Sequence, residues 1–128
     1  MNRIPNTTND RQGKVLLDAG LPAETADMVN ATGPAWSLGK LISLMPDEVS
    51  YFRENVKVSE EEDLPLATSY NLRMNRNVVR YETWDGDEEK FRAYGLYLID
   101  AVVDAVLWLI NEGWLEVMLD KDKKPLDY

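Results

Sequence analysis

Two aspartates form the clearest candidate for chemistry in this sequence. Asp100 and Asp104 are four residues apart within an apolar stretch, so on a helix their carboxylates lie one turn apart on the same face. Such a pair can hold a hard cation or share a proton if a third ligand comes from another segment. In the alternative they form the solvent edge of the helix or pair with Arg73, Arg80 or Arg92. We favour this structural role, without a metal, a cofactor or catalysis.

Three arginines form the second candidate. Arg73, Arg76 and Arg80 concentrate positive charge on one predicted hairpin of an otherwise acidic chain, and such a patch can contact the phosphates of a nucleic acid. The alternative is neutralisation by nearby acids such as Glu82, and three arginines are few for a nucleic-acid surface. We therefore expect nucleic acid to be a poor partner.

Acidic residues form the third candidate, which we favour as a partner-binding surface. They lie in two short segments: Glu60, Glu61, Glu62, Asp63, Asp85, Asp87, Glu88 and Glu89. The spacing of the second segment differs from that of a calcium-binding EF-hand loop, so we expect a solvated loop at 60–63 and a turn at 84–87. A hairpin between the two segments would place both at one edge of a sheet. There they would attract a basic protein surface.

The composition excludes several classes of chemistry. The chain has 128 residues, and 14 basic against 23 acidic side chains give a formal net charge of −9. It contains no histidine and no cysteine, which excludes disulfide bonds, zinc sites built from these residues, and Ser-His-Asp or Cys-His catalysis. The length predicts one domain. We place it at residues 10–119, between a flexible N-terminus at 1–9 and a charged tail at 120–128.

The hydropathy pattern indicates a cytoplasmic protein. Residues 1–10 hold one basic residue and no apolar run, unlike a secretory signal. The most apolar stretch, residues 95–110, is interrupted by Asp100 and Asp104, and the uncharged run that follows is too short to span a membrane. We therefore expect a cytoplasmic protein without a membrane segment.

Two segments before residue 46 carry clear helix signals. The first helix is capped by Asn9 or Asp10 and ends at Gly20, a residue type that tolerates a left-handed conformation. The second is capped by Ser37, repeats apolar residues at helical spacing, and stops at Pro46. Both ends of each helix are therefore predicted from local sequence.

Two other segments have weaker patterns. A short helix is expected after Pro22, with Ala26, Val29 and Met28 facing inward. Residues 49–58 are rich in β-branched and aromatic residues, which favours one strand.

A hairpin is predicted on either side of residues 75–76. This pairing sets Tyr70 opposite Tyr81 and Leu72 opposite Val79, so that apolar side chains share one face and polar side chains the other. The arginine of the turn disfavours a positive φ, and a four-residue loop with the same register is the alternative to a tight turn.

The C-terminal half completes an α+β fold. Residues 88–94 fit either a third strand or an early helical turn, and we favour the strand. From Leu96 the pattern is that of a core helix ending at Gly113. The predicted fold is a small antiparallel sheet of about three strands packed against this C-terminal helix, with short N-terminal helices.

Three motifs carry a resemblance to a known group of proteins. They are residues 17–28, Trp36-Ser37-Leu38-Gly39-Lys40-Leu41, and the Asp100-Ala101-Val102-Val103-Asp104 helix with Leu107-Trp108-Leu109-Ile110. The set resembles small uncharacterised α+β proteins of gut bacteria and their prophages. The resemblance implies the same order of elements and a setting in mobile genetic elements, and it implies no activity. With the acidic segments, it favours a non-enzymatic accessory protein that binds a basic partner.

Overall fold

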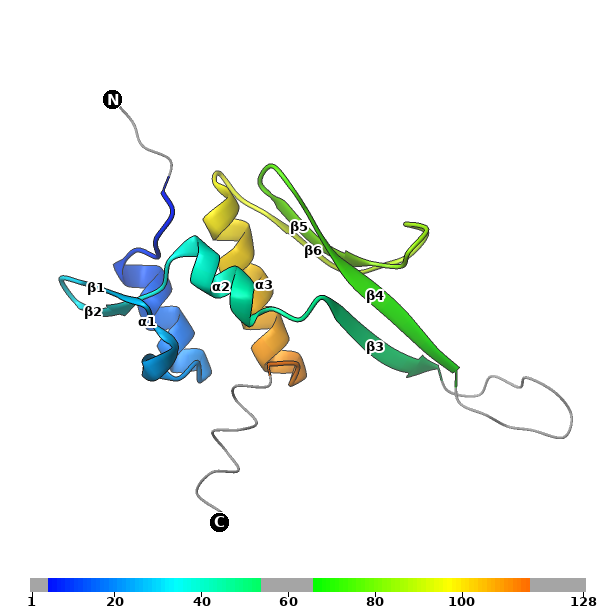
Figure 1. Ribbon diagram of the computed structural model, residues 1–128, viewed down its shortest axis with the longest axis horizontal. Helices are drawn as coiled ribbons and strands as arrows, with labels where there is room; N and C mark the ends of the chain where they lie inside the picture. The colour runs from blue at the N-terminus through cyan, green and yellow to red at the C-terminus, as the bar shows by residue number, and fades with distance from the viewer. Residues whose placement is uncertain (1–4, 54–65, 116–128) are drawn as a thin grey trace, which may run out of the picture.

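The computed structural model describes residues 5–53 and 66–115, and this part of the chain has an α+β fold. Its helices are α1 (Asp10–Ala19), η1 (Ala23–Thr25, a 3-10 helix), α2 (Leu38–Leu44) and α3 (Leu98–Glu112). Its strands are β1 (Met28–Asn30), β2 (Gly33–Ala35), β3 (Glu48–Arg53), β4 (Leu66–Asn75), β5 (Val78–Glu82) and β6 (Glu89–Tyr94). The helices gather on one side of the sheet that β3 to β6 form (Figure 1).

The predicted class is confirmed, but the strand content is larger than expected. The main sheet has four strands in the order β3-β4-β5-β6, and β1 and β2 form a second, two-stranded sheet. Of residues 88–94, which fit both periods, Glu89–Tyr94 form strand β6 at an edge of the main sheet. Of the strand expected at 49–58, residues 48–53 form β3, and the remainder lies outside the described residues.

Local capping sets the ends of α1 and α2 as predicted. The Asn9 side chain accepts a hydrogen bond from the Gln12 backbone N–H at 2.8 Å, and the Asn9 N–H donates to the Gln12 side chain at 3.0 Å. Gly20 ends α1 in the left-handed conformation, with φ 113°. At α2, the Ser37 hydroxyl accepts from the Lys40 N–H at 3.1 Å. Each cap satisfies a backbone donor that the helix leaves unpaired.

The segment after Pro22 forms a 3-10 turn and a hairpin, so the prediction of a short helix after Pro22 is wrong. Met28 and Val29 lie in β1 and are exposed, Val29 to 80%. The Asn30 side chain accepts a hydrogen bond from the Thr32 N–H at 2.9 Å, and Gly33 adopts φ 140°. This turn chemistry favours a tight reversal over a helix.

Trp36 anchors the N-terminal part of the fold. Its indole is fully buried, and its N–H donates to the Thr25 hydroxyl at 2.9 Å. Its backbone pairs with Thr8, whose N–H donates to the Trp36 carbonyl at 2.9 Å and whose hydroxyl accepts from the Trp36 N–H at 3.0 Å. Within the expected flexible terminus at 1–9, Thr8 is therefore buried and attached to the fold.

The β4–β5 hairpin keeps the predicted faces but has a different register. Leu72 lies opposite Tyr81, where we expected Tyr70. The shift is two residues, so each side chain stays on its predicted face. Tyr70 and Tyr81 are both buried in the core on the helix side of the sheet.

The turn of this hairpin explains the register. Arg76 and Asn77 connect the strands, and Arg76 adopts a positive φ of 58°, which we had considered unfavourable for an arginine. Asn77 accepts a backbone hydrogen bond from Gly95 at 3.3 Å, and its side-chain amide donates to the Gly95 carbonyl. These bonds link the turn to the segment before α3, and they offset the cost of the strained arginine.

Helix α3 is the core helix that the sequence predicts. Its buried residues are Ile99, Ala101, Val102, Val103, Ala105, Val106 and Leu109. Trp108 stacks on Phe91 of β6 with ring centroids 4.7 Å apart, and Gly113 ends the helix with φ 80°. The described helices lie on one face of the main sheet, the face that α3 contacts (Figure 1). Among the described residues, no helix has the length and apolar character needed to cross a membrane.

Candidate functional site

Asp100, the first of the two candidate aspartates, is part of the structural framework. Its carboxylate accepts hydrogen bonds from the Tyr97 backbone N–H at 3.0 Å and from the Gln12 side-chain amide at 2.8 Å. The first bond caps the N-terminus of α3, where a negative charge is also favoured by the helix dipole. The second joins α3 to α1. Gly95 passes so close that a Cβ there would lie 2.5 Å from the Asp100 Cβ.

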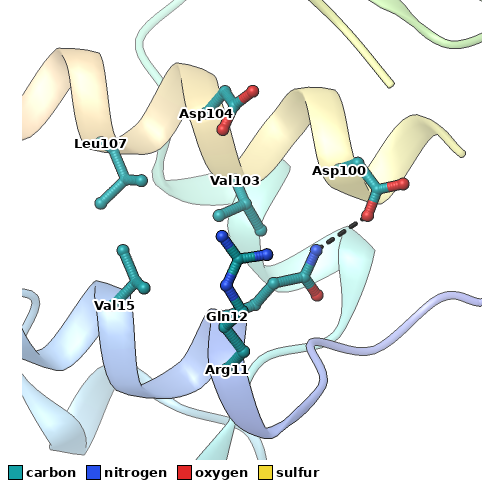
Figure 2. Close-up of a pocket in the computed structure, with 7 residues that line it drawn as sticks. All are labelled: Arg11, Gln12, Val15, Asp100, Val103, Asp104 and Leu107. Atoms are coloured by element: carbon teal, nitrogen blue, oxygen red, sulfur yellow. Dashed lines mark hydrogen bonds between the residues drawn. The ribbon is translucent and has the colours of Figure 1, made fainter. Parts of the chain in front are cut away.

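Asp104, one turn further along α3, faces a groove between α1 and α3. The groove has a volume of about 380 Å³. Figure 2 shows its lining: Arg11, Gln12, Val15, Asp100, Val103, Asp104 and Leu107. Partial burial raises the pKa of the Asp104 carboxyl, the Asp100 charge raises it further, and the Arg11 charge opposes both effects.

In the part of the chain that the structure describes, no third acidic ligand joins the two aspartates. Among the residues that the structure describes, no group of three or more Asp, Glu, His or Cys side chains could hold a metal ion. Their neighbours are Gln12 and Arg11 on α1, rather than the hairpin arginines that we had considered as partners. Sequence reasoning missed both, because the two helices are about 90 residues apart in the chain.

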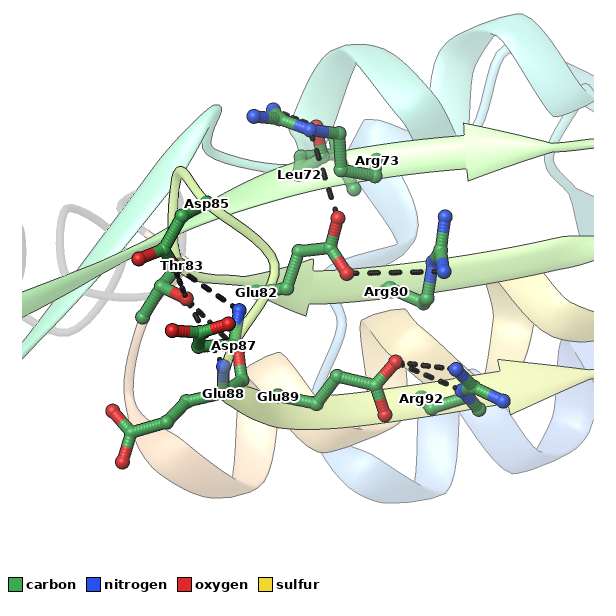
Figure 3. A network of polar contacts seen from close by, with 10 residues as sticks. All are labelled: Leu72, Arg73, Arg80, Glu82, Thr83, Asp85, Asp87, Glu88, Glu89 and Arg92. Atoms are coloured by element: carbon green, nitrogen blue, oxygen red, sulfur yellow. Dashed lines mark hydrogen bonds and ion pairs between the residues drawn. The ribbon is translucent and has the colours of Figure 1, made fainter.

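The hairpin arginines lie on the open face of the main sheet. Arg73, Arg80 and Arg92 are directly opposite one another on β4, β5 and β6, and we call them the arginine row. Glu82 lies 3.8 Å from both Arg73 and Arg80, as Figure 3 shows. The predicted neutralisation by Glu82 is therefore confirmed for these two arginines.

The arginine row differs in membership from the predicted patch. Arg76 lies in the β4–β5 turn rather than in the row. Arg92 takes part instead, and its side chain donates to Glu89 at 3.0 Å. The alternation of outward-facing residues along β6 is the signal that could have included Arg92. Because both flanking acids pair with arginines, this surface offers little net positive charge to a nucleic acid.

The predicted acidic turn is present, and hydrogen bonds within it define its conformation. We call residues 83–88, between β5 and β6, the acidic turn. The Asp85 carboxylate accepts hydrogen bonds from the Thr83 hydroxyl at 2.8 Å and from the Asp87 N–H at 3.1 Å. These bonds, the one from Asp87 first, hold the pKa of Asp85 below its ordinary value. Glu88 closes the turn by accepting from the Thr83 N–H at 2.9 Å, and Gly86 supplies the positive φ of 81°.

Trp84 lies in this turn and is the most exposed of the large apolar residues that the structure describes, at 84%. The sequence placed it in the predicted turn at 84–87, near the candidate arginine patch. Its type and position could have marked it, because tryptophan is frequent among the residues that dominate binding energy at protein interfaces. The acidic turn therefore carries an exposed aromatic residue that is adjacent in sequence to exposed acidic residues.

The other acidic candidates, Glu60 to Asp63, lie outside the described residues. The described end of β3, the start of β4 and the acidic turn lie at the same end of the sheet. However, β4 begins at Leu66, five positions before Asn71, which lies opposite Glu82. At about 3.3 Å per residue this offset is about 17 Å along the strand, which exceeds the Debye length of about 8 Å in physiological salt. The acidic turn is therefore electrostatically separate from the start of β4.

No protein-family model, no curated protein and no solved structure matches the chain.

Proposed function

We propose that this protein acts by binding, without catalysis, and that the acidic turn recognises a basic surface on a protein partner. The observation that carries the proposal is Trp84, whose ring is exposed on a turn fixed by hydrogen bonds. An exposed tryptophan offers a large contact area, and a turn whose conformation is already fixed loses less conformational entropy on binding.

The charges of the turn favour a cationic partner. Glu82 and Glu89 pair with the arginine row, whereas Asp85 and Asp87 at the tip are exposed. Because hydrogen bonds hold the pKa of Asp85 low, this carboxylate stays ionised at neutral pH. A lysine or arginine of the partner would then meet both carboxylates and the face of the Trp84 ring, an arrangement that supports a cation–π contact.

Two further parts of the proposal rest on the sequence. We also propose the cytoplasm as the setting of the interaction. The resemblance to prophage proteins adds a mobile genetic element as the setting. Neighbouring genes of phage type around the coding sequence would support that setting, and housekeeping neighbours would count against it.

The proposal is tested by capture from host cells followed by measurement on the purified pair. Trp84→Ala should reduce recovery of a basic partner by about tenfold or more, because it removes the central apolar contact. The matched control is Val29→Ala, which truncates a side chain of similar exposure on β1. It should leave recovery unchanged.

Salt dependence tests the electrostatic part. We expect Asp87→Asn to slow association, and about 0.5 M salt to remove most of the difference between this variant and the wild type. Equal recovery with Trp84→Ala and Val29→Ala would contradict the role of the turn. Binding that does not change with salt would contradict the basic partner.

A further inference from the structure

The α1–α3 groove has features of a small-molecule site that are independent of the acidic turn. Its volume of about 380 Å³ is near the lower end of the range of about 300 to 1,000 Å³ for small-ligand pockets. It lies on the helical side of the molecule, whereas the acidic turn projects from the sheet (Figure 1). A ligand of this groove would therefore be small and would bind apart from a partner at the turn.

Two opposite charges face this groove from different helices. Arg11 comes from α1 and Asp104 from α3, and Figure 2 shows the guanidinium extended toward α3. Among the described residues, neither side chain forms an ion pair within 4 Å. A carboxylate and a guanidinium that do not pair with each other can each bind the oppositely charged group of a single ligand.

The polar side chains beside this charge pair, Asp100 and Gln12, already form hydrogen bonds within the protein. Asp100 accepts from Gln12 and from the Tyr97 backbone, and the Gln12 side-chain carbonyl accepts from the Asn9 N–H. These bonds hold the groove in shape without a ligand. Asp104 is exposed and is thus the carboxylate that a cation can approach. Partial desolvation and the Asp100 charge raise its pKa, and a cation beside it would favour the ionised form.

Aliphatic side chains complete the lining. Val15 lies on α1, and Val103 and Leu107 lie on α3, all facing the same hollow (Figure 2). Val15 is 37% exposed, so a ligand that covers it would remove apolar surface from water. A short aliphatic group fits this lining better than a ring with polar substituents.

From this arrangement we propose that the α1–α3 groove binds a free amino acid with an aliphatic side chain. Its ammonium group would lie beside Asp104, its carboxylate beside Arg11, and its side chain against Val15 and Leu107. Both charges of the ligand are required, which distinguishes a free amino acid from a peptide terminus.

The proposal is tested by titrating the full chain with L-leucine while recording backbone amide resonances by NMR. We expect saturable shifts confined to residues 11–15 and 100–107. N-acetyl-leucine lacks the ammonium charge and leucinamide lacks the carboxylate, and each should bind about tenfold more weakly or worse. Arg11→Gln and Asp104→Asn should each weaken leucine binding to a similar degree.

Matched controls separate this site from general charge effects. Lys14→Gln and Asp18→Asn remove an exposed charge pair on α1 that lies outside the groove, and neither should change leucine affinity. The proposal is overturned if about 20 mM leucine produces no localised shift. That concentration is well above a Kd of about 1 mM, which corresponds to weak binding. The proposal is also overturned if leucinamide binds as tightly as leucine, because that result would show that only the amine is recognised.

Discussion

Two pairs of aspartates in this protein have the same side chains and opposite environments. Asp85 and Asp87 lie in the exposed acidic turn, where backbone and hydroxyl donors lower the pKa of Asp85. Asp100 and Asp104 lie on α3, where Asp100 is hydrogen-bonded and burial raises the pKa of Asp104. The turn stabilises its negative charge by itself, whereas the groove leaves part of its negative charge poorly compensated.

This difference separates two ways in which acids can serve binding. A carboxylate stabilised by its own turn acts as a fixed charge that guides a partner, with little dependence on contact geometry. A carboxylate that is partly desolvated gains most from a cation placed directly beside it. The acidic turn is therefore suited to a basic surface, and the groove to a small charged molecule.

The largest expected effect on stability comes from adding a third acidic residue to α3, compared with adding one to the acidic turn. Val103→Asp puts an unpaired charge at a buried position of α3 and should lower the free energy of unfolding by about 3 to 5 kcal/mol. This is a large part of the total of about 5 to 15 kcal/mol for a domain. Trp84→Asp, at the exposed turn, should change it by less than about 0.5 kcal/mol. Urea unfolding measures both, and a similar loss in the two variants would contradict the contrast.

A second test breaks the cap that Asp100 provides. Gly95→Ala places a Cβ 2.5 Å from the Asp100 Cβ, so the start of α3 must shift, at a cost of about 1 to 3 kcal/mol. The matched change Gly39→Ala lies in α2, with no atom within 4 Å of the new Cβ. It should stabilise the protein by up to about 1 kcal/mol because alanine is the better helix former. Thermal unfolding of both variants distinguishes steric contact from helix propensity.

A third test removes the acid between two members of the arginine row. Glu82→Gln leaves Arg73 and Arg80 facing each other across β4 and β5, and like charges in this position destabilise a sheet by about 1 kcal/mol or less. Lys14→Gln removes an exposed ion pair on α1, and a smaller loss of about 0.3 to 0.5 kcal/mol is expected. Added salt should reduce the effect of Glu82→Gln. An effect that grows with salt would show that the arginines do not repel each other.

The smallest expected effect concerns how stability depends on pH, because the contributions of Asp85 and Asp104 change in opposite directions. The pKa of Asp85 is lowered in the folded state, so its ionised form stabilises the fold above its ordinary pKa of 3.8, and this contribution is lost as the pH falls through the lowered pKa. The pKa of Asp104 is raised, so its ionisation opposes folding at neutral pH, and this cost disappears as the pH falls through the raised pKa. Asp85→Asn should therefore reduce stability slightly at pH 7, and Asp104→Asn should increase it.

Carboxyl NMR titration measures these two pKa values directly. A midpoint below 3.8 for Asp85 and above 3.8 for Asp104 is expected. The opposite order would reverse the assignment of the two environments. In the Arg11→Gln variant the Asp104 midpoint should rise further, because a favourable charge has been removed.

Local sequence determined the features that depend on neighbouring residues. The helix ends at Asn9, Gly20, Ser37 and Gly113 follow from side chains that satisfy adjacent backbone groups or tolerate a left-handed conformation. The two faces of the β4–β5 hairpin follow from strict alternation, which a shift of two residues leaves unchanged. The order of these elements and the amphipathic character of α3 were predictable for the same reason.

Only the tertiary structure decided which distant residues meet. The hairpin register depends on the bonds between Asn77 and Gly95. The role of Asp100 depends on Gln12, 88 residues away in the chain. Met28 and Val29 lie in a hairpin because the chain reverses at Gly33, and their apolar character predicted an inward position that they do not take. Such contacts join segments whose separation in sequence carries no periodic signal, so the packing of α1 against α3, and not the spacing of the two aspartates, gives the groove its opposite charges.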